Sequence, residues 1–133
     1  MKLGQNKNRK GKFKMNIKTI GRYLFCVPFG IMGLNHLTSA NYLAAGYVPS
    51  FVPGGVFWVY LTGLALIAAT VSFVIQKYTR LAALLTAALM LIFFLSVHLP
   101  NLIGGNMIAM SGLFKDIGLA GGALLLASNY EDN

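Results

Sequence analysis

Asp116 is the first residue of this sequence that could do chemistry, because it lies in an apolar stretch from Gly112 to Ala127. It is the only acidic residue before the C-terminal tail. A carboxylate in such surroundings is costly unless it faces the interior of a helix bundle and has a partner. At helical spacing it shares a narrow stripe with Ala120, Ala123 and Ala127, which would let a neighbouring backbone come close. The sequence therefore predicts a buried carboxylate that accepts a hydrogen bond or a proton.

Two histidines, His36 and His98, could act together with this carboxylate. One interpretation is that both histidines lie at a membrane interface and bond to loop carbonyls. Another is a proton relay or a site for the headgroup of a quinone. The third is a metal site, since two histidines and one carboxylate meet the ligand count, but their spacing is not that of a metal motif, so no metal is predicted.

Two polar neighbours complete the candidate site for ligand binding or proton relay. The site comprises His36, His98, Asn101, Lys115 and Asp116. Lys115 and Asp116 also have a purely structural interpretation. In it, the lysine extends outward to the interface while the aspartate bonds across helices.

Arg22 is the candidate lipid contact, or inner anchor, of the first apolar segment. It shares one helical face with Phe25, Phe29 and His36. Extension of its side chain to the headgroups is the favoured interpretation. Two alternatives are a contact with a carbonyl freed by Pro28, and a contact with the acidic C-terminal tail.

No self-contained active site is evident in the sequence. It has no Gly-rich phosphate loop, no Gly-x-Ser-x-Gly elbow, no His-Glu-x-x-His and no haem-attachment motif. The single cysteine, Cys26, rules out an intramolecular disulfide and a Cys-x-x-Cys pair. Whether the chain is an enzyme stays open, and at most we expect a membrane subunit of an oxidoreductase.

Composition indicates an integral membrane protein. Charged residues make up 11% of the 133 residues and apolar residues 56%, whereas a soluble domain has about 25% charged residues. The formal charge of +8 is concentrated, because eight of the eleven basic residues lie between Lys2 and Arg22. Nucleic-acid binding would need basic groups spread over a folded surface, so no nucleic acid is expected as a partner.

Apolar runs predict four membrane spans, each close to the length of about 20 residues that crosses a bilayer. We expect a basic, disordered cytoplasmic tail over 1–15, a four-span domain over 16–128 and an acidic cytoplasmic tail over 129–133. The predicted spans are Ile17 to Leu37, Val56 to Ile75, Leu81 to His98, and about Gly112 to Ala127. The segments Thr38 to Gly55 and Leu99 to Ser111 are predicted to be uncharged loops.

The distribution of basic residues predicts the orientation. The basic N-terminus and the turn with Lys77 and Arg80 should face the cytoplasm, which places both termini inside. At a rise of 1.5 Å per residue, His36, His98 and Asp116 all lie toward the outer side. Similar depth does not establish contact between them.

Four features, in this order and spacing, resemble the DoxX family of small four-helix membrane proteins. Arg22 opens the first span, and Gly33-Leu34-Asn35-His36 closes it. The stretch from Pro49 to Gly63 is similar to the proline-containing loop and the start of the second helix in that family. The last two features are the basic turn from Lys77 to Ala82, and Phe114-Lys115-Asp116-Ile117 with Gly121-Gly122.

The resemblance implies an all-α, four-helix integral membrane bundle. Some DoxX members are membrane subunits of quinone-linked sulfur or thiol redox complexes, and related families include membrane chaperones and cargo receptors. Many members carry a glutamate soon after the second-helix glycine, near where this chain has Leu66. Asp116 would then be the only acid inside the membrane.

The sequence thus leads to an accessory membrane subunit of a quinone-linked redox assembly in a bacterial-type cytoplasmic (inner) membrane. The expected partners are the lipid bilayer and other membrane or redox proteins, and a homo-oligomer is left open. A quinone or a lipid is the candidate ligand, although no residue pattern identifies a cofactor. The alternative is a non-enzymatic assembly factor, a chaperone or a small-solute pathway, because Gly118 and Gly122 form a GxxxG pattern typical of helix association.

Overall fold

Helices form nearly all of the chain that the structure describes. The computed structural model describes the backbone of residues 5–131 and the side chains of residues 17–131. Within this part there are helices but no strands, which confirms the predicted all-α class. The elements are α1 (Gln5–Thr38), α2 (Ala40–Tyr47), α3 (Gly55–Ile75), α4 (Thr79–Phe93), the π-helical turn η1 (Phe94–His98), α5 (Leu99–Ile103) and α6 (Ala109–Ser128).

Four helical stretches are long and apolar enough to cross a membrane, as predicted. They are Ile17–Thr38, Gly55–Ile75, Thr79–Ile103 and Ala109–Ser128. Only 22 to 28% of the most apolar window of each stretch is buried within the chain. Many of the other apolar side chains are exposed, and a lipid environment accommodates such surfaces. The architecture is therefore that of a multi-pass membrane protein.

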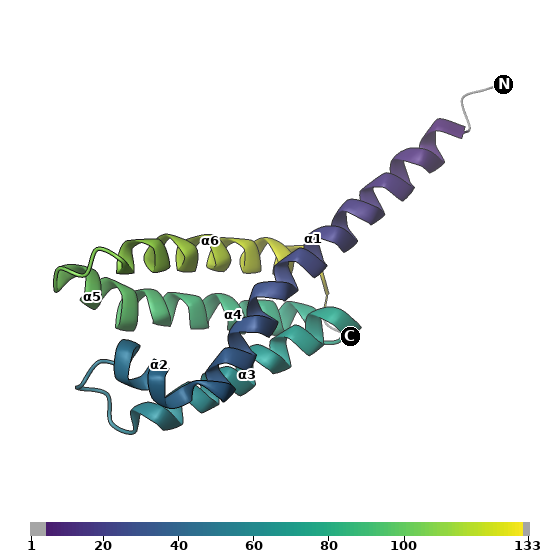
Figure 1. The fold of residues 1–133 in the computed structure, drawn as a ribbon. Coiled ribbons are helices and arrows are strands. Elements are labelled where there is room, and N and C mark those ends of the chain that lie inside the picture. The colour runs from purple at the N-terminus through teal and green to yellow at the C-terminus, as the bar shows by residue number, and fades with distance from the viewer. Residues whose placement is uncertain (1–4, 132–133) are drawn as a thin grey trace.

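The helices differ from the predicted segments in three places. α1 has helical backbone from Gln5, where composition predicted a disordered tail, and Figure 1 shows these turns extending beyond the bundle. The predicted first loop contains α2, which ends at Tyr47, two residues before Pro49. In the third span, η1 and α5 continue the helix to Ile103, because a proline in the first turn of a helical segment needs no backbone donor.

The four long helices form two antiparallel pairs, α1 with α3 and α4 with α6. Close approach of α1 and α3 depends on Gly33 and Gly63. A Cβ added at Gly33 would lie 3.1 Å from the carbonyl oxygen of Gly63, and one added at Gly63 would lie 2.8 Å from the Cβ of His36. In the second pair, alanines bring the backbones together, and the predicted stripe of Asp116, Ala120, Ala123 and Ala127 is confirmed as buried.

A single core connects the two pairs. Its buried residues are Cys26 and Phe29 from α1, Leu66, Ala69 and Phe73 from α3, Ala83 and Met90 from α4, and Ala120 and Ala127 from α6. Phe25, Phe29 and Phe73 form an aromatic cluster with ring centroids 4.8 to 6.3 Å apart. The ring of Phe25 also lies against Gly122, so it joins α1 to α6. Aromatic rings therefore fill the space that the small residues of the neighbouring helices leave open.

Candidate functional site

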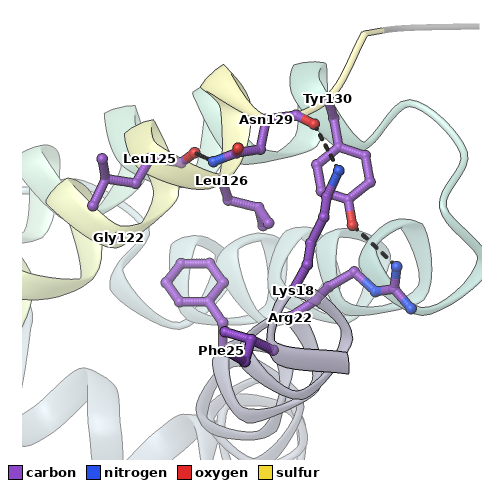
Figure 2. A pocket seen from close by; sticks show the side chains of 10 residues that line it. Lys18, Arg22, Phe25, Gly122, Leu125, Leu126, Asn129 and Tyr130 are labelled. Atoms are coloured by element: carbon purple, nitrogen blue, oxygen red, sulfur yellow. Dashed lines mark hydrogen bonds between the residues drawn. The ribbon is translucent and has the colours of Figure 1, made fainter. Parts of the chain in front are cut away.

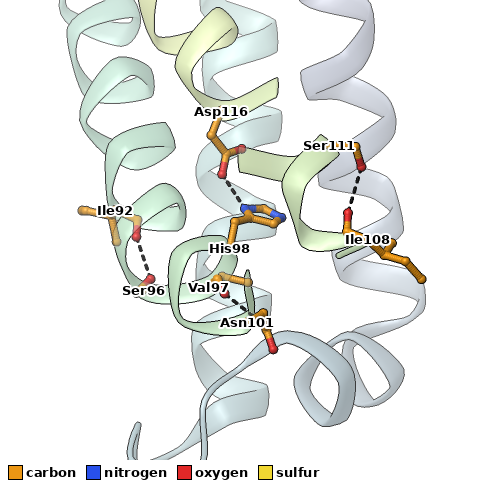
Figure 3. Close-up of polar contacts among 8 residues, drawn as sticks. All are labelled: Ile92, Ser96, Val97, His98, Asn101, Ile108, Ser111 and Asp116. Atoms are coloured by element: carbon orange, nitrogen blue, oxygen red, sulfur yellow. Dashed lines mark hydrogen bonds and ion pairs between the residues drawn. The ribbon is translucent and has the colours of Figure 1, made fainter. Parts of the chain in front are cut away.

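Asp116 and His98 form a buried pair between α6 and η1. The Nδ1 atom of His98 lies 2.5 Å from the Oδ2 atom of Asp116. The aspartate side chain is 0% exposed and the histidine side chain 14% exposed. Figure 3 shows the imidazole of His98 directed from its helical turn toward the carboxylate. The predicted bond of Asp116 across helices is confirmed, and its partner is a histidine.

The local backbone around His98 explains how the pair forms. Pro100 has no N–H, so the carbonyl of Ser96 has no i+4 amide donor, and a π-helical turn runs from Phe94 to His98. The amide of Leu99 bonds instead to the carbonyl of Phe94, five residues earlier. The extra residue in this turn changes the face on which the following side chains lie. It is at the end of this turn that the imidazole of His98 meets α6.

Gly112 provides the room for the imidazole on α6. It lies one helical turn before Asp116, so both residues occupy the same face of the helix. A Cβ added at Gly112 would collide with ring atoms of His98. A glycine followed four residues later by an aspartate therefore forms a slot into which the ring fits. The sequence analysis did not identify Gly112 as part of the site.

Two polar atoms of the pair remain available for chemistry. The Oδ1 atom of Asp116 is buried and has no hydrogen-bond partner within the described part of the chain. Because Nδ1 of His98 faces the carboxylate, its Nε2 atom is the second ring nitrogen, and it lies against Gly112. A buried acceptor without a donor is unfavourable, and a ligand hydroxyl or a water would satisfy it. The pair can therefore accept one hydrogen bond and hold one proton.

His36 does not join this pair. Its Nδ1 atom lies 2.7 Å from the carbonyl oxygen of Met32, one turn earlier in the same helix. Its ring stacks on Phe93 with the centroids 6.3 Å apart. The predicted bonding of both histidines to loop carbonyls is therefore wrong, because His36 bonds within its own helix and His98 bonds to an aspartate. The depth of a residue along a helix does not determine the direction in which its side chain points around the helix axis. These two histidines therefore contact different neighbours.

Neither of the other two predicted site residues forms a hydrogen bond or an ion pair with the carboxylate within the described residues. Asn101 donates its side-chain N–H to the carbonyl of Val97, 2.8 Å away in the same helical stretch (Figure 3). Lys115 is exposed while its neighbour Asp116 is buried, which agrees with the predicted outward extension of the lysine. Within the described residues, no group of three or more His, Cys, Asp or Glu side chains could hold a metal ion.

Arg22 lies at the opposite end of the bundle and is buried, with 5% of its surface exposed. Its Nη1 atom donates to the hydroxyl of Tyr130, 3.0 Å away, and its guanidinium lies 5.0 Å from the ring centroid of Tyr23. Its hydrogen-bond partner is thus a phenol from the C-terminal segment, which was not predicted from the sequence. An amphipathic tyrosine after a span was the available signal. Asp132, one predicted contact, lies outside the described residues.

The fold and the pair define a small all-helical protein with four candidate membrane-spanning helices and one buried histidine–aspartate pair. Residues 25–113 match a family model described as a domain of unknown function (DUF8561), and the chain belongs to this family. The matched region contains both histidines and ends before Asp116. No curated protein and no solved structure matches the chain.

Proposed function

We propose that this protein is a DoxX-like accessory subunit of a quinone-linked redox assembly in a bacterial-type cytoplasmic membrane. The proposal draws on the sequence resemblance and on one structural observation. That observation is a fully buried carboxylate, Asp116, with one oxygen bonded to His98 and the other without a hydrogen-bond partner among the described residues. Paired ionisable residues within a membrane span commonly belong to proton or ligand sites.

In this proposal, Asp116 and His98 bind the headgroup and hold the proton. The Oδ1 atom of Asp116 would accept a hydrogen bond from the hydroxyl of a quinol headgroup, which supplies the missing donor. His98 fixes the other carboxylate oxygen, and its Nε2 atom, which lies against Gly112, is the second ring nitrogen that can exchange a proton with the headgroup. A quinone bound there would supply the electron chemistry, as acceptor in its oxidised form and as donor in its quinol form. With both termini cytoplasmic, the pair lies toward the outer surface.

Quinone retention by the purified protein tests this proposal. The full chain is solubilised gently, and bound quinone is quantified by extraction and by native mass spectrometry. Asp116→Asn keeps the shape of the side chain but weakens the acceptor and changes the protonation of the pair. We expect it to lower quinone retention roughly tenfold, as expected for a lost hydrogen bond to a charged group.

Glu131→Gln is the matched control, because it neutralises an exposed carboxylate at the other end of the bundle. It should leave quinone retention unchanged. An Asp116→Asn protein that folds and keeps wild-type levels of quinone and partner proteins would refute the proposal. A wild-type protein that carries only bulk lipid would refute it as well.

One observation favours an assembly factor or chaperone as a second candidate. Of the GxxxG pair on α6, Gly122 is covered by Phe25. A Cβ added at Gly118 or at the nearby Gly121 would have no neighbouring atom within 4 Å. Open glycines on an apolar helix suit close packing against a helix of another protein. Loss of a specific membrane partner on Gly118→Leu, together with no quinone in the wild type, would favour this function over the first.

A further inference from the structure

A pocket of about 500 Å³ opens between the start of the first span and the end of α6. Figure 2 shows its two cations, Lys18 and Arg22, on α1 beside the aromatic ring of Tyr130. Phe25 and Leu126 form an apolar floor deeper in the bundle. The pocket lies at the far end of α6 from Asp116, about 20 Å away at 1.5 Å per residue. It is therefore separate from the histidine–aspartate pair.

The positive charge of Arg22 is buried without a counter-ion among residues 17–131. Its side chain is 5% exposed, and its Nε atom has no hydrogen-bond partner. The hydroxyl of Tyr130 is an uncharged acceptor for Nη1. The described part of the chain contains a single ion pair, that of His98 with Asp116. Burying a charge is costly unless it is paired, so this guanidinium is suited to an external anion.

Lys18 adds a second cation one helical turn earlier on the same face. Its Nζ atom donates to the carbonyl of Asn129, 3.0 Å away, and lies 4.2 Å from the ring centroid of Tyr130. The carbonyl ends at the C-terminus of α6 stabilise the ammonium only partially, because a helix end carries about half a charge. Both cations thus remain available to one bound anion.

The position of the pocket along the membrane-spanning stretch indicates what kind of anion fits. Lys18 and Arg22 lie at the end of a membrane-spanning stretch, where lipid phosphates are found. Phe25 and Leu126 lie on the side toward the hydrocarbon, where acyl chains would contact them. A lysine and an arginine above an apolar floor match a phosphate with attached lipid chains better than a free anion.

We propose that this pocket binds an anionic phospholipid, with its phosphate between Lys18 and Arg22 and its chains along Phe25 and Leu126. The bound lipid neutralises the arginine and joins the first helix to the last. This site does not depend on the proposed redox function, and loss of quinone binding would leave it unaffected.

The test is native mass spectrometry of the full chain mixed with equal amounts of phosphatidylglycerol and phosphatidylcholine of the same chain length. We expect preferential retention of phosphatidylglycerol. Lys18→Gln and Arg22→Gln should each lower that retention roughly fivefold, the effect of one cation near an anionic lipid. Arg22→Lys should restore most of the binding, because it keeps the charge. Lys18 is exposed, so its variant remains informative if an Arg22 variant fails to fold.

Lys77→Gln and Arg80→Gln are the matched controls. They remove the same two cation types from exposed positions at the same end of the bundle, Lys77 from the turn between α3 and α4 and Arg80 from the first turn of α4. Equal retention of the two lipids, or equal losses in these controls, would overturn the proposal. Inorganic phosphate that displaces phosphatidylglycerol at equal concentration would overturn the lipid as occupant. Lipid preference that emerges only after Glu131→Gln and Asp132→Asn would show that the acidic tail fills the pocket instead.

Discussion

The two histidines differ in the acceptor that each Nδ1 atom contacts. His36 faces an uncharged carbonyl of its own helix, whereas His98 faces the carboxylate of Asp116. A carboxylate stabilises a protonated imidazole far more than a carbonyl does, because the two charges attract in a low-dielectric interior. His98 therefore contacts a group that can carry a charge, whereas His36 contacts a neutral one. The two residues should contribute differently to the stability of the fold.

Removal of the imidazole of His98 should destabilise the protein more than the same change at His36. His98→Gln leaves Asp116 buried without the imidazole that it contacts, which we expect to cost about 3 to 5 kcal/mol of unfolding free energy. His36→Gln loses a single hydrogen bond to a carbonyl, worth about 1 kcal/mol. Thermal and denaturant unfolding in detergent would measure the loss of unfolding free energy in each variant. The double variant with Asp116→Asn should recover part of the loss, and purely additive effects would contradict the pairing.

Residue types were a good guide to which side chains are buried. They were a poorer guide to which side chains contact each other. Asp116 was predicted to bond across helices and Lys115 to extend outward, since charge in an apolar helix leaves few alternatives. The partner of Asp116 could not be selected, because that choice depends on the rotation of each helix about its axis. The contact of Arg22 with Tyr130 was missed for the same reason, as it joins residues 108 positions apart.

At the scale of the helices, glycines allow neighbouring helices and side chains to approach closely. Gly63 sits where α3 crosses α1, and Gly112 holds the slot for His98. Gly118 and Gly21 have nothing within 4 Å of an added Cβ. These four positions separate the effect of a glycine on packing from its effect on helix propensity. They provide matched tests within the same two pairs of helices.

Gly112→Ala should disrupt the histidine–aspartate pair although it changes neither residue. The new Cβ would push the ring of His98 away from Asp116, and the helix backbone cannot yield easily. We expect a loss of about 1 to 3 kcal/mol in unfolding free energy, with quinone retention falling as in Asp116→Asn. Gly118→Ala is the control, and it should be neutral or stabilising by up to about 1 kcal/mol. Equal stabilities for the two variants would argue against the slot.

Gly63→Ala should weaken the pairing of α1 with α3 and leave the site untouched. Its Cβ would lie 2.8 Å from the Cβ of His36, so the two backbones must separate. Unfolding free energy should fall by about 1 to 3 kcal/mol, while the ratio of quinone retained to folded protein should not change. Gly21→Ala has open space around it and serves as the reference. A selective loss of quinone in Gly63→Ala would mean that the two helix pairs are coupled.

Hydropathy predicted the second span to within one residue at each end and the C-terminal end of the first span to within one residue, because a bilayer demands long apolar helices. The third and fourth spans are longer than predicted. The third span was predicted to end at His98, yet η1 and α5 carry it to Ile103. α2 was missed because eight residues are too few for a clear helical pattern. Short helices and π turns depend on neighbours that a local pattern does not contain.

At the scale of the whole molecule, the two candidate sites lie at opposite ends of α6. The histidine–aspartate pair belongs to the α4–α6 pair of helices, and the cationic pocket joins α6 to α1. The order of four antiparallel spans places the start of α1, the α3–α4 turn and the end of α6 at one end. The orientation of the protein in the membrane therefore decides which surface each site faces.

Thiol labelling should place the histidine–aspartate pair toward the outer surface. In a Cys26→Ala background, single cysteines at Ser50 and Met107 should react with a membrane-impermeant reagent in intact cells. Cysteines at Lys77 and Glu131 should react only after permeabilisation, because basic residues stay in the cytoplasm. All four positions are exposed in the structure, so unequal labelling reflects the side of the membrane. The reverse pattern would place the pair toward the cytoplasm.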